Sequence, residues 1–455
     1  MNMKRSSERG QTLILLVLAF VVLLGFVALA LDGGMVYADR RRAQNAADAS
    51  SLAGGGAAGL SLENDFVDYE VFTCVDNGQP EYGEMLQALA TARAAAVSRA
   101  ASNDYAIDED ISDNNGVTAV CGIYNTGGWV DKYVDITATI TADTTTSFAH
   151  FIYNGPLRNT VRAVTRVRPR MPVAFGNAIV ALALECPNST DGGIQFQGVP
   201  GDPADPNDSI IINGGIFSNA CMACPGNEDV TVNGSAQYIT TEFRCDAFAT
   251  SQANLPLPKY SWNIPEPDCS NPPAHIPDQH GGGSIGPGHY GRIRVTAAND
   301  LLILSSGLYC IHEEFTINGG EVRIDPLPNG NPGGVTISMV DGPFNIGGNT
   351  LVTLAAPPTT PTNTCGYCPP AIPGLLIYSD QVNASSVRAL GTAGSSYTGM
   401  IFAPTAQVDV GGDTGVFVNG QVIGDTVIVH GGPQVQVNYG PDVNFRPPAS
   451  LELFR

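Results

Sequence analysis

The sequence has few charged residues, and most of those it has are acidic. Charged residues make up 14% of the 455, and 43 Asp and Glu outnumber 22 Lys and Arg, which gives a net charge of −21. Residues 1–60 hold six basic and four acidic residues, a balance of +2, so the remainder carries −21 − 2 = −23. Because a strongly acidic body repels a phosphate backbone, we expect no nucleic-acid partner.

Motifs that carry common chemistries are also missing. The chain has no G-x-x-x-x-G-K-[ST] loop for a nucleotide and no HExxH motif for zinc. Glycosidases need paired carboxylates, whereas the acidic residues at the edges of the late apolar runs stand singly: Asp325, Asp380, Asp409 and Asp425. We therefore expect no enzyme activity, no small-molecule substrate, and no catalytic, cofactor-binding or metal-binding residues.

One stretch, His280–Gly286, matches sequence motifs of hydrolases. The letters "HGGG" at His280–Gly283 and "GGSIG" at Gly282–Gly286, centred on Ser284, match the oxyanion and nucleophile motifs of some esterases. A nucleophile elbow lies between a strand and a helix, and its oxyanion loop comes from an earlier segment. Here the two motifs share glycines and no apolar strand precedes them, so they indicate a glycine-rich loop.

The residues that are abundant suit short strands joined by turns, with 52 glycines and 32 prolines. Ten cysteines all follow the first 70 residues: Cys74, Cys121, Cys186, Cys221, Cys224, Cys245, Cys269, Cys310, Cys365 and Cys368. An even number in a loop-rich sequence favours disulfides formed outside the cytoplasm.

Two cysteine pairs have the spacing of metal knuckles, "CMAC" at Cys221–Cys224 and "CGYC" at Cys365–Cys368. A zinc ribbon has two such knuckles separated by about 15–20 residues, and these two lie much farther apart. Distant knuckles can still meet in a fold. Disulfides are therefore the prediction for both pairs, and zinc binding and redox chemistry stay as alternatives.

The longest uncharged run covers residues 10–31 and is dominated by Leu, Val, Phe and Ala. A helix needs about 20 such residues to cross a bilayer, so we predict a single transmembrane helix from about Thr12 to Leu31. A cleaved signal peptide is the alternative, because "ALA" at Ala28–Ala30 has the small-x-small pattern of a cleavage site. The helical pattern continues past Asp32, which favours a retained anchor.

We predict that residues 1–60 form this anchor and a helical stem that ends at "GGGAAG" (54–59). Residues 61–171 form a small α+β region. Its predicted elements are an alanine-rich helix at 81–105 and alternating strands at 132–148 and 160–169.

The region from 172 to 455 consists of short apolar runs separated by Asn-Gly and Gly-Gly. Asn213 and Asn233 lie 20 residues apart. Short strands with recurring turns and a coil period near 20 predict a parallel β-helix, or β-solenoid, with a β-sandwich as the alternative. The dense Pro and Gly between 251 and 293 predict an irregular loop that interrupts it. The fold class is thus mainly β behind a helical anchor.

Three stretches near the N-terminus carry a family resemblance: "ERGQTLILLVLAF", the Asp32-Gly33-Gly34 exit, and "AQNAADASSLAGG" at 43–55. Together they resemble the N-terminal module of TadE/TadG-like proteins of the Flp (Tad) pilus system. Ser50 and Ser51 stand where the family pattern has alanines. The C-terminal half is similar to the glycine-rich β-repeat regions of some members.

Two features depart from relatives of this family. Some carry a von Willebrand A domain with a D-x-S-x-S metal motif, which this chain lacks. Pilin-like members are cut after a glycine and keep a glutamate five residues later. Here Leu15 stands five residues after Gly10, which argues against pilin-type cleavage and polymerisation.

The resemblance implies a structural component of a pilus or secretion apparatus, anchored in the bacterial cytoplasmic membrane, with pilus-assembly or envelope proteins as partners. We expect a cytoplasmic N-terminus and an extracytoplasmic body. Lys4, Arg5 and Arg9 favour this orientation, and Arg40–Arg42 oppose it under the positive-inside rule. The cysteines and the resemblance decide for it. A surface adhesin and an envelope enzyme acting on polysaccharide are the rival functions.

Overall fold

The computed structural model describes residues 9–65, 67–69, 71–75, 79–80, 83–109, 114–125, 130–149, 153, 155–186, 193–198, 209–225, 229–259, 262–325, 333–359, 370–412, 415–431 and 434–454. The chain divides into two compact units. Unit 1 comprises Met1–Met171 and Pro448–Arg455, and unit 2 comprises Pro172–Pro447. The fold is mainly β, with one long apolar helix at the N-terminus.

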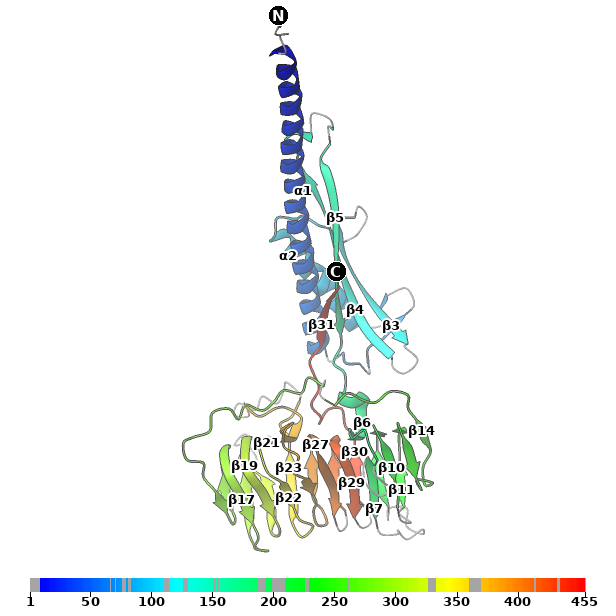
Figure 1. Ribbon diagram of the computed structural model, residues 1–455. Helices are drawn as coiled ribbons and strands as arrows, with labels where there is room; N and C mark the ends of the chain where they lie inside the picture. Colours follow the sequence, from blue (N-terminus) through cyan, green and yellow to red (C-terminus); the bar gives the residue numbers. More distant parts are fainter. Residues whose placement is uncertain are drawn as a thin grey trace, which may run out of the picture. The chain divides into compact units, whose positions relative to one another are not determined.

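Unit 1 combines two helices with antiparallel strands. Its described elements are α1 (Arg9–Asn64), α2 (Gly83–Ala101), β1 (Cys74–Val75), β2 (Gln79–Pro80), β3 (Gly116–Asn125), β4 (Val130–Thr144), β5 (Leu157–Arg168) and β31 (Ser450–Phe454). The main sheet has the order β3-β4-β5-β31, and every pair in it is antiparallel. Figure 1 shows α1 running along β4 and β5 and extending well beyond them.

The sequence patterns explain how this unit folds. The predicted helix at 81–105 and the strands at 132–148 and 160–169 are confirmed as α2, β4 and β5, with slightly different ends. In β4 the alternating Val134, Ile136, Ala138 and Ile140 are fully buried. They form one core with the inner faces of α1 and α2, so one face of the sheet is covered by helix.

The last strand corrects a predicted boundary. We predicted that the second half of the chain continues to residue 455, but Ser450–Phe454 form β31 at the edge of the unit 1 sheet, where they pair with β5. The letters "SLELF" allow a strand but do not say which sheet it joins. Its partner lies more than 280 residues earlier in the sequence, and no local pattern reveals such a pairing.

Unit 2 is built from short strands. After the short helix η2 (Val173–Gly176), its described strands are β6 (Asn177–Ala181), β7 (Ile194–Gly198), β8 (Ile210–Asn213), β9 (Gly215–Ser218), β10 (Cys221–Ala223), β11 (Val230–Val232), β12 (Ala236–Tyr238), β13 (Thr241–Phe243), β14 (Thr250–Gln252), β15 (Gln279–His280), β16 (Gly283–Ile285), β17 (Gly288–Val295), β18 (Leu301–Leu304), β19 (Gly307–Ile317), β20 (Glu321–Ile324), β21 (Val335–Met339), β22 (Phe344–Ile346), β23 (Leu351–Ala355), β24 (Leu375–Ser379), β25 (Val387–Ala389), β26 (Ser396–Thr398), β27 (Met400–Gly412), β28 (Phe417–Asn419), β29 (Val422–Gly431) and β30 (Gln436–Asn438).

The strands of unit 2 stack in two long sheets. The first follows the order β14-β12-β9-β6-β29-β27-β24-β21-β19-β17-β15, with further strands paired beside this path. The second follows β11-β8-β30-β28-β26-β23-β20-β18-β16. All strand pairs given for unit 2 are parallel (for example β27 with β29 and β28 with β30). A sandwich built from antiparallel hairpins would not give this pairing.

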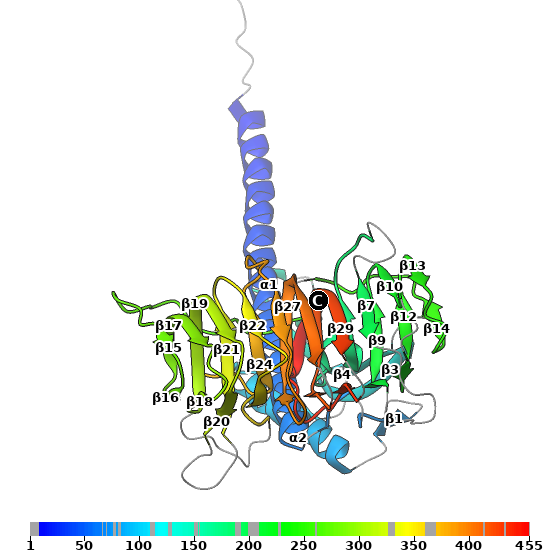
Figure 2. The ribbon, with the colours of Figure 1, turned by 90° about the horizontal axis from the view of Figure 1, so that it is seen from below.

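The order of the strands shows that the chain enters unit 2 in the middle of the stack. It winds outward from β6 to β14, crosses to β15 at the opposite edge, and winds back to β29, which pairs with β6. Figure 2 shows β14 and β15 at opposite edges. The first strands, β6 and β8, therefore pair with the last strands, β29 and β30, at a seam, and both chain ends of unit 2 leave from it.

Side chains as well as backbone hold this seam. Asn213 of β8 donates to Asn438 of β30 at 2.6 Å, and Asn438 donates to Asn419 of β28 at 2.9 Å. Asn233 donates to Asn213 at 2.8 Å, so four asparagines form a continuous ladder. Three of these asparagines, Asn213, Asn233 and Asn419, are followed by glycine, and the row that they form with Asn438 runs across the seam.

The apolar residues of unit 2 fill the space between the sheets. One cluster of fully or nearly fully buried side chains runs the length of the stack. Within it, Phe315 and Phe344 stack at 4.9 Å between ring centroids, and Tyr309 and Tyr397 are fully buried. The interior is therefore a packed core to which strands of both sheets contribute apolar side chains.

The predicted loop at 251–293 is only partly correct. After the end of β14 at Gln252, the described residues up to 278 are in no strand, but the last fifteen residues of the predicted loop contain β15, β16 and most of β17. Gly283 and Gly288 have φ values of 136° and 147°, a conformation that glycine adopts readily. Pairing with the neighbouring coils β18 and β19 makes these glycine-rich segments extended, which overrides their weak strand propensity.

Candidate functional site

The N-terminal half of α1 is an exposed apolar surface. Its large apolar side chains from Leu13 to Leu31 are 51–71% exposed. By length and composition the helix can cross a membrane, with a mean hydropathy of 3.2 in its most apolar window. The 22 uncharged residues rise about 33 Å at 1.5 Å each, close to the hydrocarbon thickness of about 30 Å. The predicted transmembrane segment therefore coincides with the part of α1 that unit 1 leaves uncovered.

The C-terminal half of α1 lies against the sheet through small residues. Ala43, Ala46, Ala47 and Ala58 are at most 2% exposed. A Cβ atom on Gly54 would lie 2.8 Å from Ile136 Cγ2, and one on Gly55 would lie 2.5 Å from Thr165 Cγ2. These two glycines allow the helix backbone to approach β4 and β5 closely.

The predicted end of the stem was wrong for the same reason. We expected "GGGAAG" to end the helix, but α1 continues through it to Asn64. Glycine weakens a helix by about 1 kcal/mol relative to alanine, yet here the close packing against the sheet and α2 compensates. Glycines in this stem therefore mark contact positions.

Two buried serines replace alanines of the family pattern, and both have hydrogen-bond partners. Ser50 Oγ donates to the carbonyl of Ala46 at 2.7 Å, and Ser51 Oγ donates to the carbonyl of Asp48 at 3.1 Å. Thr165 of β5 in turn donates to Ser51 Oγ at 3.0 Å. The stem is thus joined to the sheet by a buried polar contact as well as by apolar packing.

Asp32 ends the apolar run and is only 5% exposed. Its Oδ1 accepts the backbone N–H of Ser147 at 2.7 Å, and its Oδ2 accepts those of Phe148 and Ala149. These residues belong to the connection between β4 and β5. No sequence pattern predicts this partner for Asp32, because an aspartate after an apolar helix is usually interpreted as a solvated residue at the end of the span.

The outer face of the unit 1 sheet carries a row of ion pairs. Arg166 donates to Asp135 at 2.8 Å, and Arg168 donates to Asp131 at 2.8 Å and to Glu452 at 2.9 Å. The bond to Asp131 raises the pKa of the Arg168 guanidinium. Because Glu452 lies on β31, this row ties the C-terminal strand to the body of the sheet.

In unit 2 the segment between β14 and β15, residues 253–278, crosses the stack and is called the strap here. Ten strand spacings separate β14 from β15 in the first sheet, which is about 48 Å at 4.8 Å each. Twenty-six residues can reach about 85 Å, so the strap has length to spare. Residues 260–261 lie outside the part of the strap that the structure describes.

Contacts along the strap hold it to successive strands. Asn219, next to β9, exchanges two hydrogen bonds with the backbone of Leu257 at 2.7 and 2.8 Å. Lys259 forms an ion pair of 2.6 Å with Asp425 of β29. Trp262 and Ile264 pack on an apolar cluster that includes outward-facing residues of β6, β24 and β27. The strap therefore covers a second, smaller core.

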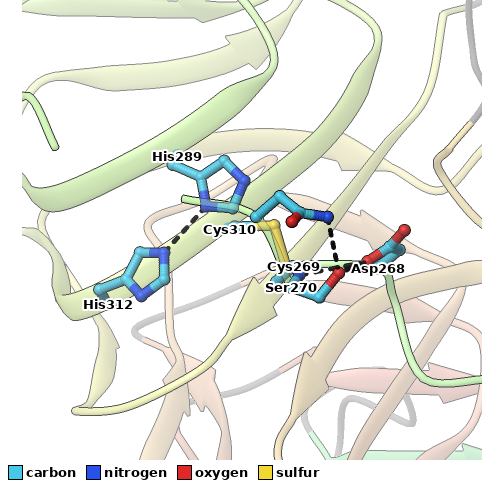
Figure 3. Close-up of a disulfide and its surroundings, with 7 residues drawn as sticks. Asp268, Cys269, Ser270, His289, Cys310 and His312 are labelled. Carbon is cyan, nitrogen blue, oxygen red and sulfur yellow. Dashed lines mark hydrogen bonds between the residues drawn. A yellow bond between two sulfur atoms is a disulfide. The ribbon is translucent and has the colours of Figure 1, made fainter. Parts of the chain in front are cut away.

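A disulfide holds the far end of the strap, between Cys269 and Cys310 of β19. Figure 3 shows this disulfide beside His289 of β17 and His312 of β19. The two imidazoles are stacked, and His289 Nδ1 lies 3.0 Å from His312 Nε2, so one ring donates to the other. Burial, and then the proximity of His289, lower the pKa of His312.

The structure tests the cysteine predictions directly. Cys221 pairs with Cys186 and Cys224 pairs with Cys245, so "CMAC" is not a metal knuckle but provides two separate disulfides. Cys74 pairs with Cys121 in unit 1. Cys365 and Cys368 lie outside the described residues, and their alternatives stay open. Within the described part of the chain, no group of three or more His, Cys, Asp or Glu is placed to hold a metal.

The residues of the hydrolase-like motifs, His280–Gly286, are divided between two strands. His280 ends β15 and Ser284 lies in the middle of β16. Strands β15 and β16 belong to different sheets, and β16 is followed by β17, not by a helix. A nucleophile elbow needs a strand-to-helix turn, so this geometry does not match one. Asp409, one of the single acidic residues, lies 3.4 Å from Arg388 in an ion pair.

Comparison with known proteins gives one match. Residues 10–58 match the Tad family, described as "Putative Flp pilus-assembly TadE/G-like". No curated protein and no solved structure matches the chain. The matched segment begins in the apolar half of α1 and ends in the docked half, so it contains Asp32, the small-residue contacts and both serines. Residues 10–58 are therefore similar to the TadE/G-like family, as the sequence motifs predicted.

Proposed function

We propose that the protein is a membrane-anchored, extracytoplasmic component that supports assembly of a Flp-type pilus or secretion apparatus and acts without catalysis. The observation that carries the proposal is the position of the family match. It covers the helix that is exposed and apolar in its first half and docked on a sheet in its second half. This is the form of a membrane anchor that presents a folded body at a defined distance from the bilayer.

Disulfides support an extracytoplasmic body. Eight of the ten cysteines form four disulfides, and they occur in both units. Structural disulfides persist in oxidising compartments and are rare in the cytoplasm. Since all of these cysteines follow the apolar helix, the N-terminus lies in the cytoplasm and the body lies beyond the cytoplasmic membrane.

Unit 2 is proposed to be a β-solenoid that serves as a binding surface. Its parallel strands recur about every 20 residues and stack in register, which is the pattern of such folds. Stacked coils give long, flat flanks, and solenoids use extended surfaces to bind other proteins. Pilus-assembly or envelope proteins are the partners that this role requires.

The decisive experiment separates anchoring from the body's own activity. In a host that makes the pilus, the gene is deleted and replaced either by the wild type or by a chain whose residues 1–31 are exchanged for a cleavable signal peptide. We expect the wild type to restore pilus assembly, and we expect the released body to be exported, to form its disulfides and to fail in assembly.

Other outcomes would favour the rival functions. If the released body restores assembly as well as the wild type does, anchoring has no role and the proposal is wrong. Normal pili with a loss of surface attachment in the deletion strain would point to an adhesin. Depolymerisation of envelope glycans by purified protein, abolished by a single Asp→Ala change, would point to an enzyme.

A further inference from the structure

The connection between β4 and β5 contacts α1 at Asp32. Asp32 accepts hydrogen bonds from three successive backbone N–H groups, those of Ser147, Phe148 and Ala149. A carboxylate that is 5% exposed and holds three donors fixes this tip of the hairpin against the helix. Wherever residue 32 lies relative to a bilayer, the hairpin tip lies there too.

The apolar run places residue 32 at the edge of the hydrocarbon. Residues 10–31 are uncharged, and as a helix they rise about 33 Å, slightly more than the hydrocarbon core of about 30 Å. Asp32 is the first charged residue after this run. If α1 spans the membrane as proposed above, the hairpin tip lies in the interfacial layer on the exit side.

The tip and the adjoining helix expose aromatic side chains at this depth. Phe148 is 42% exposed and Tyr153 is 54% exposed. On α1, Tyr37 is 68% exposed and lies five residues, or about 7.5 Å, beyond Asp32. Exposed aromatic rings are unfavourable in water, whereas tyrosine in particular is enriched at membrane interfaces, where its ring is buried and its hydroxyl stays hydrated.

Arginines follow at the next depth. Arg40–Arg42 are exposed and lie eight to ten residues, or about 12–15 Å, beyond Asp32 along the helix. The headgroup layer is about 5–8 Å thick on each side of a bilayer. Long arginine side chains can extend back toward lipid phosphates. Arg40–Arg42 oppose a cytoplasmic N-terminus under the positive-inside rule, but on the exit side they can bind lipid phosphates.

From these levels we infer that the β4–β5 hairpin tip is a second membrane contact, an interfacial aromatic collar beside the exit of α1 that binds the boundary between lipid headgroups and acyl chains. Phe148 and Tyr153 insert their rings, and Asp32 sets their depth. The inference rests on the proposed membrane anchoring. Its consequence is that the body is held at two points, which restricts rotation and tilt of unit 1 at the membrane.

The test measures the depth of single positions in the full-length protein. Phe148→Trp is reconstituted into phosphatidylcholine vesicles whose lipid is brominated near the headgroup end of its acyl chains. The signal of the wild type, which has Trp129 and Trp262, is subtracted. We expect bromolipid to quench the added tryptophan severalfold more than a water-exposed one. Tyr153→Trp provides a second, independent reporter in the same tip.

Two matched variants calibrate the scale. Tyr124→Trp is the exposed control, because Tyr124 is 63% exposed and pairs with Asp131 at the other end of β4. That position is thirteen residues, or about 43 Å, from the tip end of the strand. Phe20→Trp, reconstituted into vesicles whose lipid is brominated near the ends of its acyl chains, reports the proposed membrane span, since residue 20 lies near the middle of the apolar run.

The outcomes separate the inference from the function on which it rests. If Phe20→Trp is quenched but Phe148→Trp and Tyr153→Trp are quenched no more than Tyr124→Trp, the collar is wrong and the anchor stands. If Phe20→Trp is not quenched either, the membrane anchoring fails and the collar fails with it. Strong quenching at the tip together with weak quenching at Tyr124→Trp supports both.

Discussion

Unit 1 pairs its strands antiparallel and covers one face of its sheet with helices, whereas the strand pairs of unit 2 are parallel and its strands stack in two long sheets. In unit 1 the core forms between two kinds of surface, a small-residue helix stripe and one sheet face. In unit 2 the core is a single column between stacked sheets. Both solutions bury apolar side chains and satisfy the backbone, but they depend on different residues.

The difference shows where each unit is sensitive. A helix packed through glycine and alanine has no room for an added methyl group, so unit 1 depends on individual small residues. A stack of parallel strands tolerates change within one strand but depends on what holds the strands in order. In unit 2 these are the seam between its first and last strands and the strap that joins its two edges.

The largest expected effect comes from removing the strap disulfide. Cys269→Ser with Cys310→Ser opens a link that spans 41 residues, and we expect unit 2 to lose about 2–4 kcal/mol of stability. Strands β15, β16 and β17, next to the freed end of the strap, should open first. Hydrogen exchange measured by mass spectrometry resolves this strand by strand.

The matched control removes a disulfide of similar span from the other unit. Cys74→Ser with Cys121→Ser opens a link of 47 residues in unit 1. By loop entropy the two losses should be of similar size, but they should appear in different units. Faster exchange in both units after either change would show that the two units do not fold separately.

An intermediate effect is expected from two neighbouring glycines in α1, and the two changes should have opposite signs. Gly55→Ala places a Cβ atom 2.5 Å from Thr165 Cγ2, so we expect a loss of about 1–3 kcal/mol from overpacking. Gly56→Ala meets nothing within 4 Å and should stabilise the helix by up to about 1 kcal/mol. Thermal unfolding in detergent, followed by circular dichroism, gives both values.

This pair tests whether close packing or flexibility explains the glycines of the stem. Equal stabilisation by both alanines would mean that α1 does not lie as close to β5 as the structure places it. Equal destabilisation would mean that the helix needs flexible residues here. Only opposite signs agree with a stem whose glycines are contact positions.

These comparisons also show what the sequence could predict. The apolar helix, α2 and the alternating strands of unit 1 follow from periodicity, because each signal lies within a few consecutive residues. The short strands of unit 2 were visible for the same reason, as apolar runs separated by turns such as Asn213-Gly214 and Asn233-Gly234. The family motif located the stem, and the structure adds why its small residues are needed.

Long-range pairing could not be predicted in this way. Nothing in "SLELF" reveals that β31 joins β5, and nothing in the strap sequence reveals that the chain enters the stack in the middle. The glycine-rich residues from His280 to Gly286 were interpreted as a loop because their strand propensity is low. Pairing of β15 with β17 and of β16 with β18 nevertheless imposes strand geometry on them. The partner of Asp32 was missed because it lies more than 110 residues away.

The smallest expected effect is a dependence on pH that is confined to unit 2. Burial, and then the proximity of His289, lower the pKa of His312. Burial also lowers the pKa of His430, and of its two charged neighbours Asp409 opposes this shift and Arg388 adds to it. The stability of unit 2 should therefore fall as the pH drops through about 6.5, the ordinary pKa of histidine.

The sign follows from proton counting. When the folded pKa lies below the unfolded one, the unfolded state binds more protons between the two values, and lower pH favours unfolding. The decline should stop below the folded pKa, where both states are protonated. His312→Gln should make the melting temperature of unit 2 less dependent on pH, whereas His275→Gln, at an exposed position of the strap, should leave the slope unchanged. An equal change of slope in both variants would mean that histidine content alone, and not the half-buried pair His289 and His312 beside the strap, sets the response.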